Sequence, residues 1–511
     1  MSGGTSPESP FPNERVSSIE GLDLSLPRHH RTTTQLAVTL LSKVEAIIGL
    51  VERAEIEYGR ELRAVHPSFQ ASARNLIHFD ALAKLDLTEL KHELRTIGLN
   101  GDITAPFAVL PTLRSVRDVL QIISGQEIDP SRLGIEREDI GRLENLAVKH
   151  AELGLGPAPQ LHPTRVMVSS HGELARDFTK VKALVEAGMN ILRINCAHGN
   201  ADEWRQTAQL ARRAANECGK HLRIICDLAG PKVRTGPLEH DEPIILRVDD
   251  TIHVKAAAIL GRNKACLPDG TPHSPAQVSC TLPEALKVVS VGDRVLFDDG
   301  NISGVVEACD GTSAAVRITY VLNDHHPLLA KKGINFPDTV LKVPALSATD
   351  RAALATVVEI ADMVALSFTR SAEDIADLET ELTRLHGQHL TVVLKPETPQ
   401  AIADLPRLIL AAMQSPPIAI MIPRGDLAVE LGYDKLSPAQ ERILTYGEAA
   451  HIGVIWATQV LEKLTTLGVP ARAEVTDVIA GSRADCIMLP YGPHVVKTVK
   501  FIDKILPHTN R

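Results

Sequence analysis

The sequence predicts an α/β fold: a TIM (β/α)8 barrel that carries an inserted small β-barrel lid domain and follows an α-helical N-terminal region. Short apolar runs that alternate with helical segments predict the barrel, because parallel strands buried on both faces have this pattern. Three of these runs come before, and five come after, a stretch of short alternating strands and turns. Eight β/α units close a barrel, and the interrupting stretch predicts a separate β domain.

The composition is that of a globular chain with a net acidic charge. Of the 511 residues, 44% are hydrophobic and 23% charged, and the formal net charge is −9. The acidity, together with an aromatic content of only 3%, argues against a nucleic-acid partner, which requires basic or stacking surfaces. The seven cysteines show no Cys-x-x-Cys spacing, so we expect reduced thiols, no zinc site and a cytoplasmic location.

The N-terminal part of the chain divides into a tail and a helical region. Residues 1–32 are rich in Ser, Pro, Gly and charge and lack the apolar core of a signal peptide, which predicts a disordered tail. From 33 to 160 the apolar residues recur at helical spacing, and the region ends in a Gly- and Pro-rich linker at 154–164. We find no apolar run long enough to span a bilayer and therefore expect no membrane partner.

The barrel begins after this linker. Its first three strands are predicted at 165–170, 191–196 and 222–228. Helical segments separate them, and a β-α-β-α-β order requires parallel pairing. The rhythm breaks at about Pro237 and resumes at LAKKGINFP, residues 329–337. We therefore assign 161–236 and 333–511 to the barrel and 237–332 to the inserted lid.

Charged residues follow two neighbouring apolar strands within the stretch 390–430. Lys395 and Glu397 close the first strand, and Arg424 and Asp426 close the second. The carboxyl ends of barrel strands meet at one face, which is where such folds carry out chemistry. A carboxylate from each strand, with a lysine beside one of them, can hold Mg²⁺ and neutralise a phosphoryl group. The alternative is that these are ordinary solvated charges at the ends of buried strands.

Charged and polar residues also recur at the ends of the other predicted strands. Each alone has an ordinary explanation: Asn195 can satisfy backbone groups, Arg193 can pair with Asp227, and His198 can be a surface or core histidine. Together, several cations and two or three carboxylates predict an anionic substrate with phosphate and carboxylate groups, bridged to the protein by a divalent metal. Such a site suits phosphoryl transfer by positioning and charge neutralisation. The full set is Arg193, Asn195, His198, Asp227, Lys232, Arg234, Ser367, Arg370, Lys395, Glu397, Arg424, Asp426, Thr458 and Gln459.

Nine sequence blocks, in this order, carry a resemblance to a known family. They are LRINCAHG, CDLAGPKVRTG, VGDRVLFDDGNIS, KKGINFP, MVALSFTRSAEDI, LKPE, MIPRGDLAVE, WATQVLEKL and RAEVTDV. Over about Thr164 to Leu489 the chain resembles pyruvate kinase. The resemblance implies Mg²⁺-dependent phosphoryl transfer from phosphoenolpyruvate to ADP, giving pyruvate and ATP, with Mn²⁺ as an alternative metal.

The resemblance also implies roles for individual residues. Arg193 would bind the transferring phosphate, Lys395 would stabilise its charge in flight, and Thr458 would lie near the methylene carbon that is protonated. Glu397 and Asp426 would ligate the metal. The residues expected to face the nucleotide phosphates or to come from the mobile lid are Asn195, His198, Arg234, Asp299 and Lys331.

The monovalent cation is a separate question. Potassium-dependent members of the family have a threonine after the aspartate of strand three and a glutamate after Gly-Pro, where this chain has Leu228 and Lys232. Ala197 likewise replaces a serine ligand. The ammonium of Lys232 can supply the missing positive charge, so we expect that K⁺ is not required.

The chain departs from the family in the loops after strands one and eight. Ser170-His171-Gly172 replaces Gly-Pro-Ala, Pro490-Tyr491-Gly492 replaces Ser-Gly-Glu, and Pro396 stands where the family has an apolar residue. We expect the family's C-terminal regulatory domain to be absent. The N-terminal helical region resembles the extension of a longer, tail-less subgroup of bacterial pyruvate kinases.

Two other functions stay open at this stage. One is a different Mg²⁺-enolate barrel enzyme, such as a 2-oxo-acid lyase or decarboxylase, because the same metal pair would serve it. The other is a catalytically silent barrel that senses a nucleotide or metabolite, with the helical region as its output. The lid and the lysine beside the metal pair favour phosphoryl transfer. The sequence determines neither the role of the N-terminal helices nor the effectors, and a homo-oligomer stays open.

Overall fold

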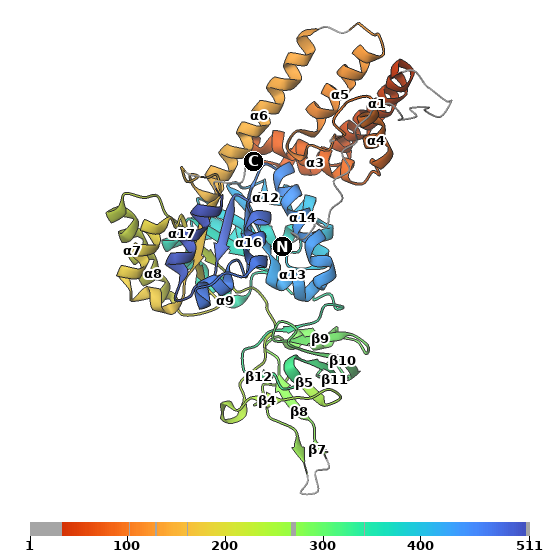
Figure 1. The fold of residues 1–511 in the computed structure, drawn as a ribbon. Coiled ribbons are helices and arrows are strands. Elements are labelled where there is room, and N and C mark those ends of the chain that lie inside the picture. The colour runs from red at the N-terminus through yellow and green to blue at the C-terminus, as the bar shows by residue number, and fades with distance from the viewer. Residues whose placement is uncertain are drawn as a thin grey trace, which may run out of the picture.

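The computed structural model describes residues 33–101, 103–127, 130–160, 162–266, 272–341 and 343–506. The tail predicted at 1–32 lies outside the described residues. Three parts follow one another in space: a helical region, a barrel and a β domain, with the helical region and the β domain at opposite ends of the barrel (Figure 1).

The centre of the molecule is a closed barrel of eight parallel strands, which confirms the predicted fold class. Around the barrel the strand order is β1-β18-β17-β16-β15-β14-β3-β2. All residues of the five barrel strands that follow the β domain in the chain are buried, as expected for strands that are covered on both faces. The strands are β1 (Arg165–Ser169), β2 (Ile191–Asn195), β3 (Arg223–Asp227), β14 (Met363–Leu366), β15 (Thr391–Leu394), β16 (Ile418–Pro423), β17 (Gly453–Ala457) and β18 (Cys486–Leu489).

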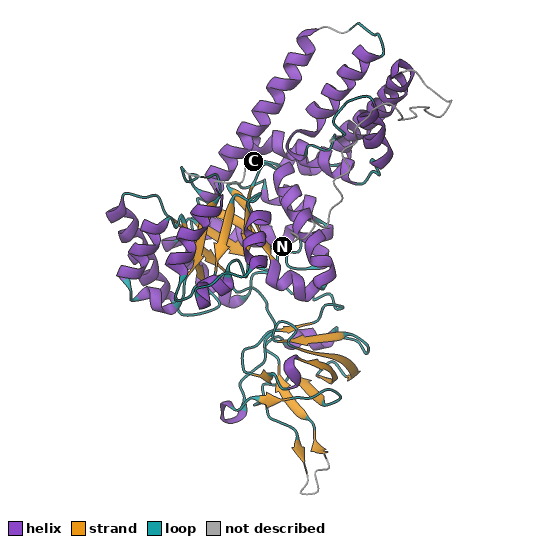
Figure 2. Cartoon of the chain, in the orientation of Figure 1, coloured by secondary structure: helices purple, strands orange, loops and turns teal. Residues whose placement is uncertain are grey.

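Helices surround the barrel (Figure 2). Several of them begin at residues with side-chain caps: Asn200 accepts the N–H groups of Asp202 and Glu203, and Ser347 and Ser371 each start a capping box. The helices are α7 (Phe178–Ala187), α8 (Ala201–Cys218), α9 (Ala348–Ile360), α10 (Ala372–Arg384), α11 (Pro399–Ala403), α12 (Leu405–Ala412), α13 (Arg424–Leu431), α14 (Tyr433–Ala449), α15 (Glu462–Leu467), α16 (Arg472–Gly481) and α17 (Val495–Ile505).

Six helices form the N-terminal region. They are α1 (Thr33–Glu57), α2 (Gly59–Ala64), α3 (Gln70–Ala83), α4 (Thr88–Thr96), α5 (Val109–Ile123) and α6 (Pro130–Leu155). The long helix α6 reaches the amino end of the barrel, where Gly154 lies against the Ile418 carbonyl at the start of β16. Leu155 enters the cluster of apolar side chains that fills the barrel interior. The helical region is therefore anchored to the end of the barrel opposite the strand-end charges.

Helix α1 corrects one expectation. Its 25 residues are long and apolar enough to cross a membrane. The expectation that the chain contains no apolar run of this length is therefore wrong. The core helix of a folded domain passes the same test. Here one stripe of α1 is buried against α3 and α5. The absence of a membrane partner stays a prediction.

The inserted β domain has its own hydrophobic core and a six-stranded sheet in the order β13-β9-β10-β11-β5-β8. Its last strand, β13, pairs with β9 and lies beyond residue 332, where we had ended the insertion. The sheet therefore includes two residues that the sequence assigned to the barrel. The strands are β4 (Ile244–Ile245), β5 (Thr251–Lys255), β6 (Ala265–Cys266), β7 (Pro272–Ser274), β8 (Ala276–Ser279), β9 (Arg294–Phe297), β10 (Ile302–Cys309), β11 (Ser313–Val321), β12 (Pro327–Leu328) and β13 (Ile334–Asn335).

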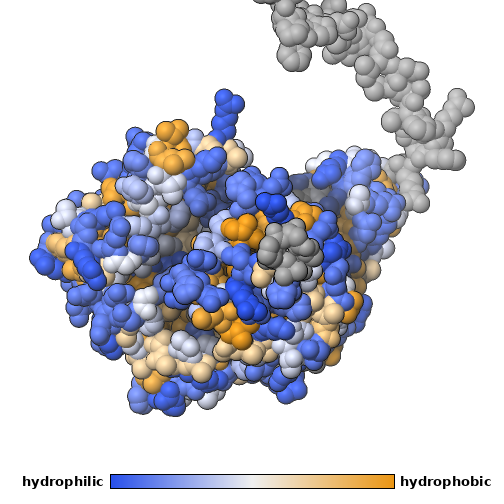
Figure 3. Space-filling model, turned by 90° about the horizontal axis from the view of Figure 1, so that it is seen from below, coloured by the Kyte–Doolittle hydropathy of each residue, from blue (hydrophilic) through white to orange (hydrophobic). Residues whose placement is uncertain are grey.

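The view from the β-domain side shows a mostly hydrophilic surface with small, separate hydrophobic patches (Figure 3). Scattered apolar side chains of this kind are normal for a protein surface. Short 3₁₀ turns complete the chain: η1 (Pro67–Phe69), η2 (Pro106–Ala108), η3 (Gly172–Ala175), η4 (Glu239–Asp241), η5 (Pro283–Lys287) and η6 (Leu322–Asp324).

Candidate active site

Lys395 is the centre of a cluster at the carboxyl ends of the barrel strands. Lys395 directly follows β15 and is only 8% exposed. Its Nζ donates to Ser367 Oγ at 2.7 Å and to Asp227 Oδ1 at 3.0 Å. Glu397 Oε1 lies 3.0 Å from the same nitrogen. Residues from β3, β14 and β15 thus meet at one ammonium group.

Asp227 links this lysine to an arginine. Arg193, on β2, donates to Asp227 Oδ2 from Nε at 2.9 Å and from a terminal nitrogen at 2.6 Å, and also donates to Ser169 Oγ. The pairing of Arg193 with Asp227 that we considered from sequence is therefore present. Both cations are fixed by one carboxylate, so their positions are set before any substrate arrives.

The charges in this cluster are stabilised mutually. Burial alone would raise the pKa of Asp227, but Lys395 and Arg193 outweigh it and lower that pKa. Burial likewise opposes the charge on Lys395, but Asp227 and Glu397 raise its pKa above the ordinary value. Both groups are therefore charged at neutral pH, and the ammonium is a permanent positive charge.

Glu397 differs from Asp227 because one of its oxygens has no hydrogen-bond donor. The backbone N–H of Phe368 donates to Oε2 at 2.7 Å. Oε1 is buried and accepts no hydrogen bond from the described residues, although it lies within ion-pair distance of Lys395. Burial raises the pKa of Glu397 to about 7, and Lys395 only partly offsets this. A buried carboxylate oxygen without a donor is suited to bind a cation.

Asp426 lies at the start of α13 and already has a cationic partner. Lys232 Nζ lies 2.7 Å from Asp426 Oδ1 and 3.4 Å from Asp299 Oδ1. Asp299 belongs to the β domain, so Lys232 connects the barrel carboxylate to the lid. The three side chains line a cavity of about 560 Å³ that also reaches Thr458.

Thr458 follows β17 in a left-handed backbone conformation, with φ at 71°. Arg424 holds this turn by donating to the carbonyls of Ala457 and Thr458, while it pairs with Asp477 of α16. A Cβ on Gly425 would lie 2.9 Å from Thr458 Cγ2, so only glycine fits beside this turn. Arg424 therefore acts as a structural support for Thr458 in this arrangement.

The donor set fits a magnesium ion. Glu397 and Asp426 are near enough for Asp426 to contribute to the raised pKa of Glu397. Within the described residues no group of three or more His, Cys, Asp or Glu side chains forms a metal cage. Mg²⁺ is ordinarily held by one or two carboxylates together with substrate oxygens and water, so the two carboxylates Glu397 and Asp426 suffice.

A second cavity, of about 360 Å³, lies on the other side of Arg193. Asn195, His198 and Arg193 line it together with the loop after β1. Burial lowers the pKa of His198, and the nearby Arg234, Arg193 and Lys331 lower it further. Arg193 in the wall, with Arg234 and Lys331 near His198, can attract phosphate groups, although the carboxylate of Glu203 also lines the cavity.

The two altered loops form one contact at the rim of this cavity. The His171 ring stacks on the Tyr491 ring with centroids 5.4 Å apart. Tyr491 accepts a hydrogen bond from Lys180 at 2.6 Å and donates to Glu173 at 2.9 Å. The departures from the family pattern after strands one and eight are thus packed against each other.

The structure divides the predicted site residues into groups. Arg193, Lys395 and Glu397 form the connected cluster, Asp426 and Asp299 meet at Lys232, and Arg234 donates to the Lys331 carbonyl at the base of the lid. Asp227 and Ser367 are more central than we expected, although both were visible at strand ends. The Phe368 amide and Asp477 have no local sequence signal, because only the folded chain brings them to the site.

Comparisons with known proteins match this architecture. A family model described as "Pyruvate kinase, barrel domain" matches residues 162–492. The chain is 30% identical over 352 residues to a pyruvate kinase of Geobacillus stearothermophilus, which covers 68% of this chain and 57% of that protein. It is 31% identical to a pyruvate kinase of Mycobacterium tuberculosis, with coverage of 64% and 66%. For a pyruvate kinase of Trypanoplasma borreli, identity is 30% and coverage 70% and 69%.

The matched part spans just over half to about two thirds of the length of the first two relatives. The family model covers more than half of this chain and includes every strand of the barrel. The chain therefore belongs to the pyruvate kinase family.

Proposed function

We propose that the protein is a Mg²⁺-dependent pyruvate kinase that transfers the phosphoryl group of phosphoenolpyruvate to ADP, giving pyruvate and ATP, without a requirement for K⁺. The observation that carries this proposal is the buried Lys395 ammonium, which Asp227 and Ser367 fix 3.0 Å from Oε1 of the buried Glu397 carboxylate. A fixed positive charge next to a metal site is what phosphoryl transfer needs, because the reaction is accelerated mainly by positioning and charge stabilisation.

Glu397 and Asp426 would hold Mg²⁺, or Mn²⁺ in its place. When bound, the metal would supply positive charge that neutralises the substrate oxygens. The chain's own residues do the rest. Arg193 binds the transferring phosphate, and Lys395 stabilises its negative charge between donor and acceptor. Both are held in place by Asp227, so little reorganisation is needed during transfer.

The remaining roles concern the enolate and the nucleotide. Thr458 lines the same cavity as Asp426 and would lie near the methylene carbon that receives a proton. Asn195, His198 and Arg234 would face the nucleotide phosphates from the cavity beside Arg193 or from its edge. Asp299 and Lys331 belong to the lid, whose closure would exclude water from the transferring group.

Lys232 supports the independence from K⁺. Burial opposes its charge, but Asp426 and Asp299 raise its pKa, so the ammonium persists at neutral pH. It supplies a positive charge beside the metal carboxylates where other members would bind the monovalent cation.

The test is a coupled assay for pyruvate and ATP formation, comparing the wild type with Lys395→Met. We expect turnover in the wild type and a loss of roughly 10²–10³-fold in kcat in the variant. Nucleotide affinity should change little, since Lys395 acts on the transferring group.

Two results would contradict the proposal. Absence of phosphoryl transfer with surviving decarboxylation of oxaloacetate would identify a Mg²⁺-enolate lyase or decarboxylase. Tight nucleotide binding with neither reaction would identify a sensor. A cytoplasmic location and a homo-oligomeric state stay predictions, to be checked by fractionation and by light scattering.

A further inference from the structure

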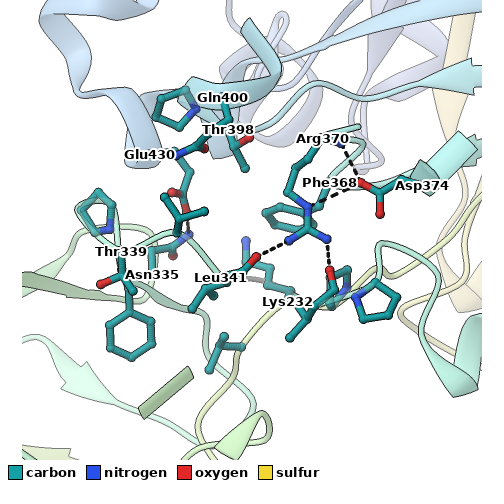
Figure 4. A pocket seen from close by; sticks show the side chains of 18 of the residues that line it. Lys232, Asn335, Thr339, Leu341, Phe368, Arg370, Asp374, Thr398, Gln400 and Glu430 are labelled. Carbon is teal, nitrogen blue, oxygen red and sulfur yellow. Dashed lines mark hydrogen bonds and ion pairs between the residues drawn. The ribbon is translucent and has the colours of Figure 1, made fainter. Parts of the chain in front are cut away.

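A cavity of about 470 Å³ lies where the β domain joins the barrel, outside the residues assigned to catalysis except for Lys232. Both connecting segments of the lid line it, together with the loops after β14 and β15 (Figure 4). We call it the hinge pocket and define it by Val233, Asn335, Phe336, Leu341, Phe368 and Glu430. Its volume is within the range of small-molecule sites.

The walls of the hinge pocket are largely apolar, and its one arginine is already satisfied. Arg370 crosses one side of the pocket and donates to the carbonyls of Leu341 and Val343 (Figure 4). It also pairs with Asp374 at 3.6 Å. No charge on Arg370 is therefore left for an anionic ligand.

Asn335 and Glu430 offer acceptors on the opposite side, and Thr398 and Gln400 lie near them (Figure 4). Asn335 Nδ2 donates to Glu430 Oε1 at 2.6 Å, which uses the amide donor within the protein. Asn335 is 4% exposed, and its Oδ1 is buried without a hydrogen-bond partner among the described residues. A buried acceptor that lacks a donor costs free energy, so a ligand that brings an N–H or O–H group gains affinity here.

We propose that the hinge pocket binds an apolar small molecule that carries a hydrogen-bond donor and no negative charge. The apolar walls take its body, and the acceptors Asn335 and Glu430 take its donor. A carboxylate or phosphate ligand is disfavoured, because it would face Glu430, while Arg370 and Lys232, the cations that line the pocket among the described residues, are already paired.

The position of the pocket connects its occupancy to the active site. Phe368 forms part of the wall in a left-handed conformation, with φ at 54°, and its N–H donates to Glu397. Lys232, at another edge, pairs with Asp426. The lid can close only if its connecting segments move relative to the barrel loops. A molecule wedged between them therefore hinders closure and lowers kcat; this consequence, unlike binding itself, rests on the proposed function.

The test uses three probes of similar shape: indole, which has an N–H donor; benzofuran, which has none; and indole-3-carboxylate, which is anionic. Binding is measured by saturation-transfer NMR and calorimetry on the full chain. We expect indole to bind roughly tenfold more tightly than benzofuran, as the loss of one buried hydrogen bond predicts, and the carboxylate to bind least. Equal binding of all three probes, or no binding of indole, would overturn the proposal.

Variants locate the site. Leu341→Trp fills the pocket and should abolish indole binding, whereas Leu329→Trp, at a 38% exposed position on the same connection and outside the pocket, should not. Val340→Trp, at the 52% exposed pocket residue beside it, replaces Leu341→Trp if that variant does not fold. Asn335→Leu should remove the preference for indole over benzofuran. Unchanged indole binding to the pocket-filling variant would refute the site.

Activity gives a second readout. Indole should lower the kcat of the wild type. The kcat of the pocket-filling variant should be the same with and without indole. If the protein shows no turnover, the proposed function is wrong. The binding experiments still test whether the hinge pocket binds indole. If indole binds in the pocket and kcat does not fall, the link to lid closure is wrong.

Discussion

Lys232 Nζ lies 2.7 Å from Oδ1 of Asp426, one of the two carboxylates that we propose as metal ligands. The same nitrogen lies 3.4 Å from Asp299 of the lid. An ammonium group of the chain thus lies beside the proposed metal site, and it also joins the barrel to the lid.

This contact predicts how the enzyme responds to potassium. Replacing K⁺ by choline at fixed ionic strength should leave the wild-type rate unchanged. In Lys232→Glu the rate without K⁺ should fall roughly tenfold or more, since one partner of a partly buried charge pair is reversed, and K⁺ should restore part of it. Lys182→Glu, on an exposed pair with Glu217, is the control. A several-fold stimulation of the wild type by K⁺ would refute the prediction.

If Glu397 is a metal ligand, its substitution should raise the Mg²⁺ concentration that the enzyme needs. Removing its charge in Glu397→Gln leaves Asp426 as the one carboxylate of the proposed pair, so the Mg²⁺ concentration for half-maximal rate should rise roughly 10–100-fold. A titration of rate against Mg²⁺ after removal of metal by EDTA measures this. Glu359→Gln, at an exposed position on α9, should behave as the wild type. Equal Mg²⁺ dependence of the two variants would exclude Glu397 as a ligand.

The burial of Leu155 in the barrel interior allows a prediction of how much this contact of the N-terminal region contributes to stability. Its side chain is 1% exposed within the barrel interior, so Leu155→Ala should lower the free energy of unfolding by about 2–5 kcal/mol through lost burial and a residual cavity. Leu153→Ala, on the same helix but at a 48% exposed residue, should have little effect. Urea denaturation measures both. Similar losses in the two variants would mean that Leu155 does not anchor the region.

His451 lies at the junction of the helical region and the barrel, and we expect it to make the stability of the protein depend on pH. It is 1% exposed, and its ring contacts Ser72 Oγ at 3.0 Å and the Phe107 carbonyl at 2.7 Å. Burial lowers its pKa from 6.5 to about 4. The unfolded chain therefore binds this proton first as the pH falls. The contribution to stability is complete above about pH 6.5 and is lost progressively toward pH 4, about 2 kcal/mol between about pH 7.5 and 5.

The matching experiment compares denaturation across this pH range in the wild type, His451→Asn and His389→Asn. Asparagine tolerates the left-handed backbone of residue 451, where φ is 52°, so the fold should survive. The slope of stability against pH should decrease in His451→Asn only. An unchanged slope would assign the acid sensitivity to other groups.

The local pattern of the sequence was enough to predict much of the fold. Eight apolar runs with intervening helical periodicity specified the barrel, because burial on both faces requires consecutive apolar residues that are visible without any partner. The ends of those runs also identified Lys395, Glu397 and Asp426, since a charged residue that follows an apolar run marks the carboxyl end of a strand.

The tertiary structure decided which of these residues meet. Asp227 lies 168 positions from Lys395, and Asp477 lies 53 positions from Arg424, so no local pattern relates them. The same holds for Leu155 inside the barrel and for β13 in the lid sheet. Periodicity is a property of neighbouring residues and can be read from the chain. Ion pairs, the burial of the Glu397 carboxylate and the hinge pocket arise only when barrel closure brings distant strand ends together.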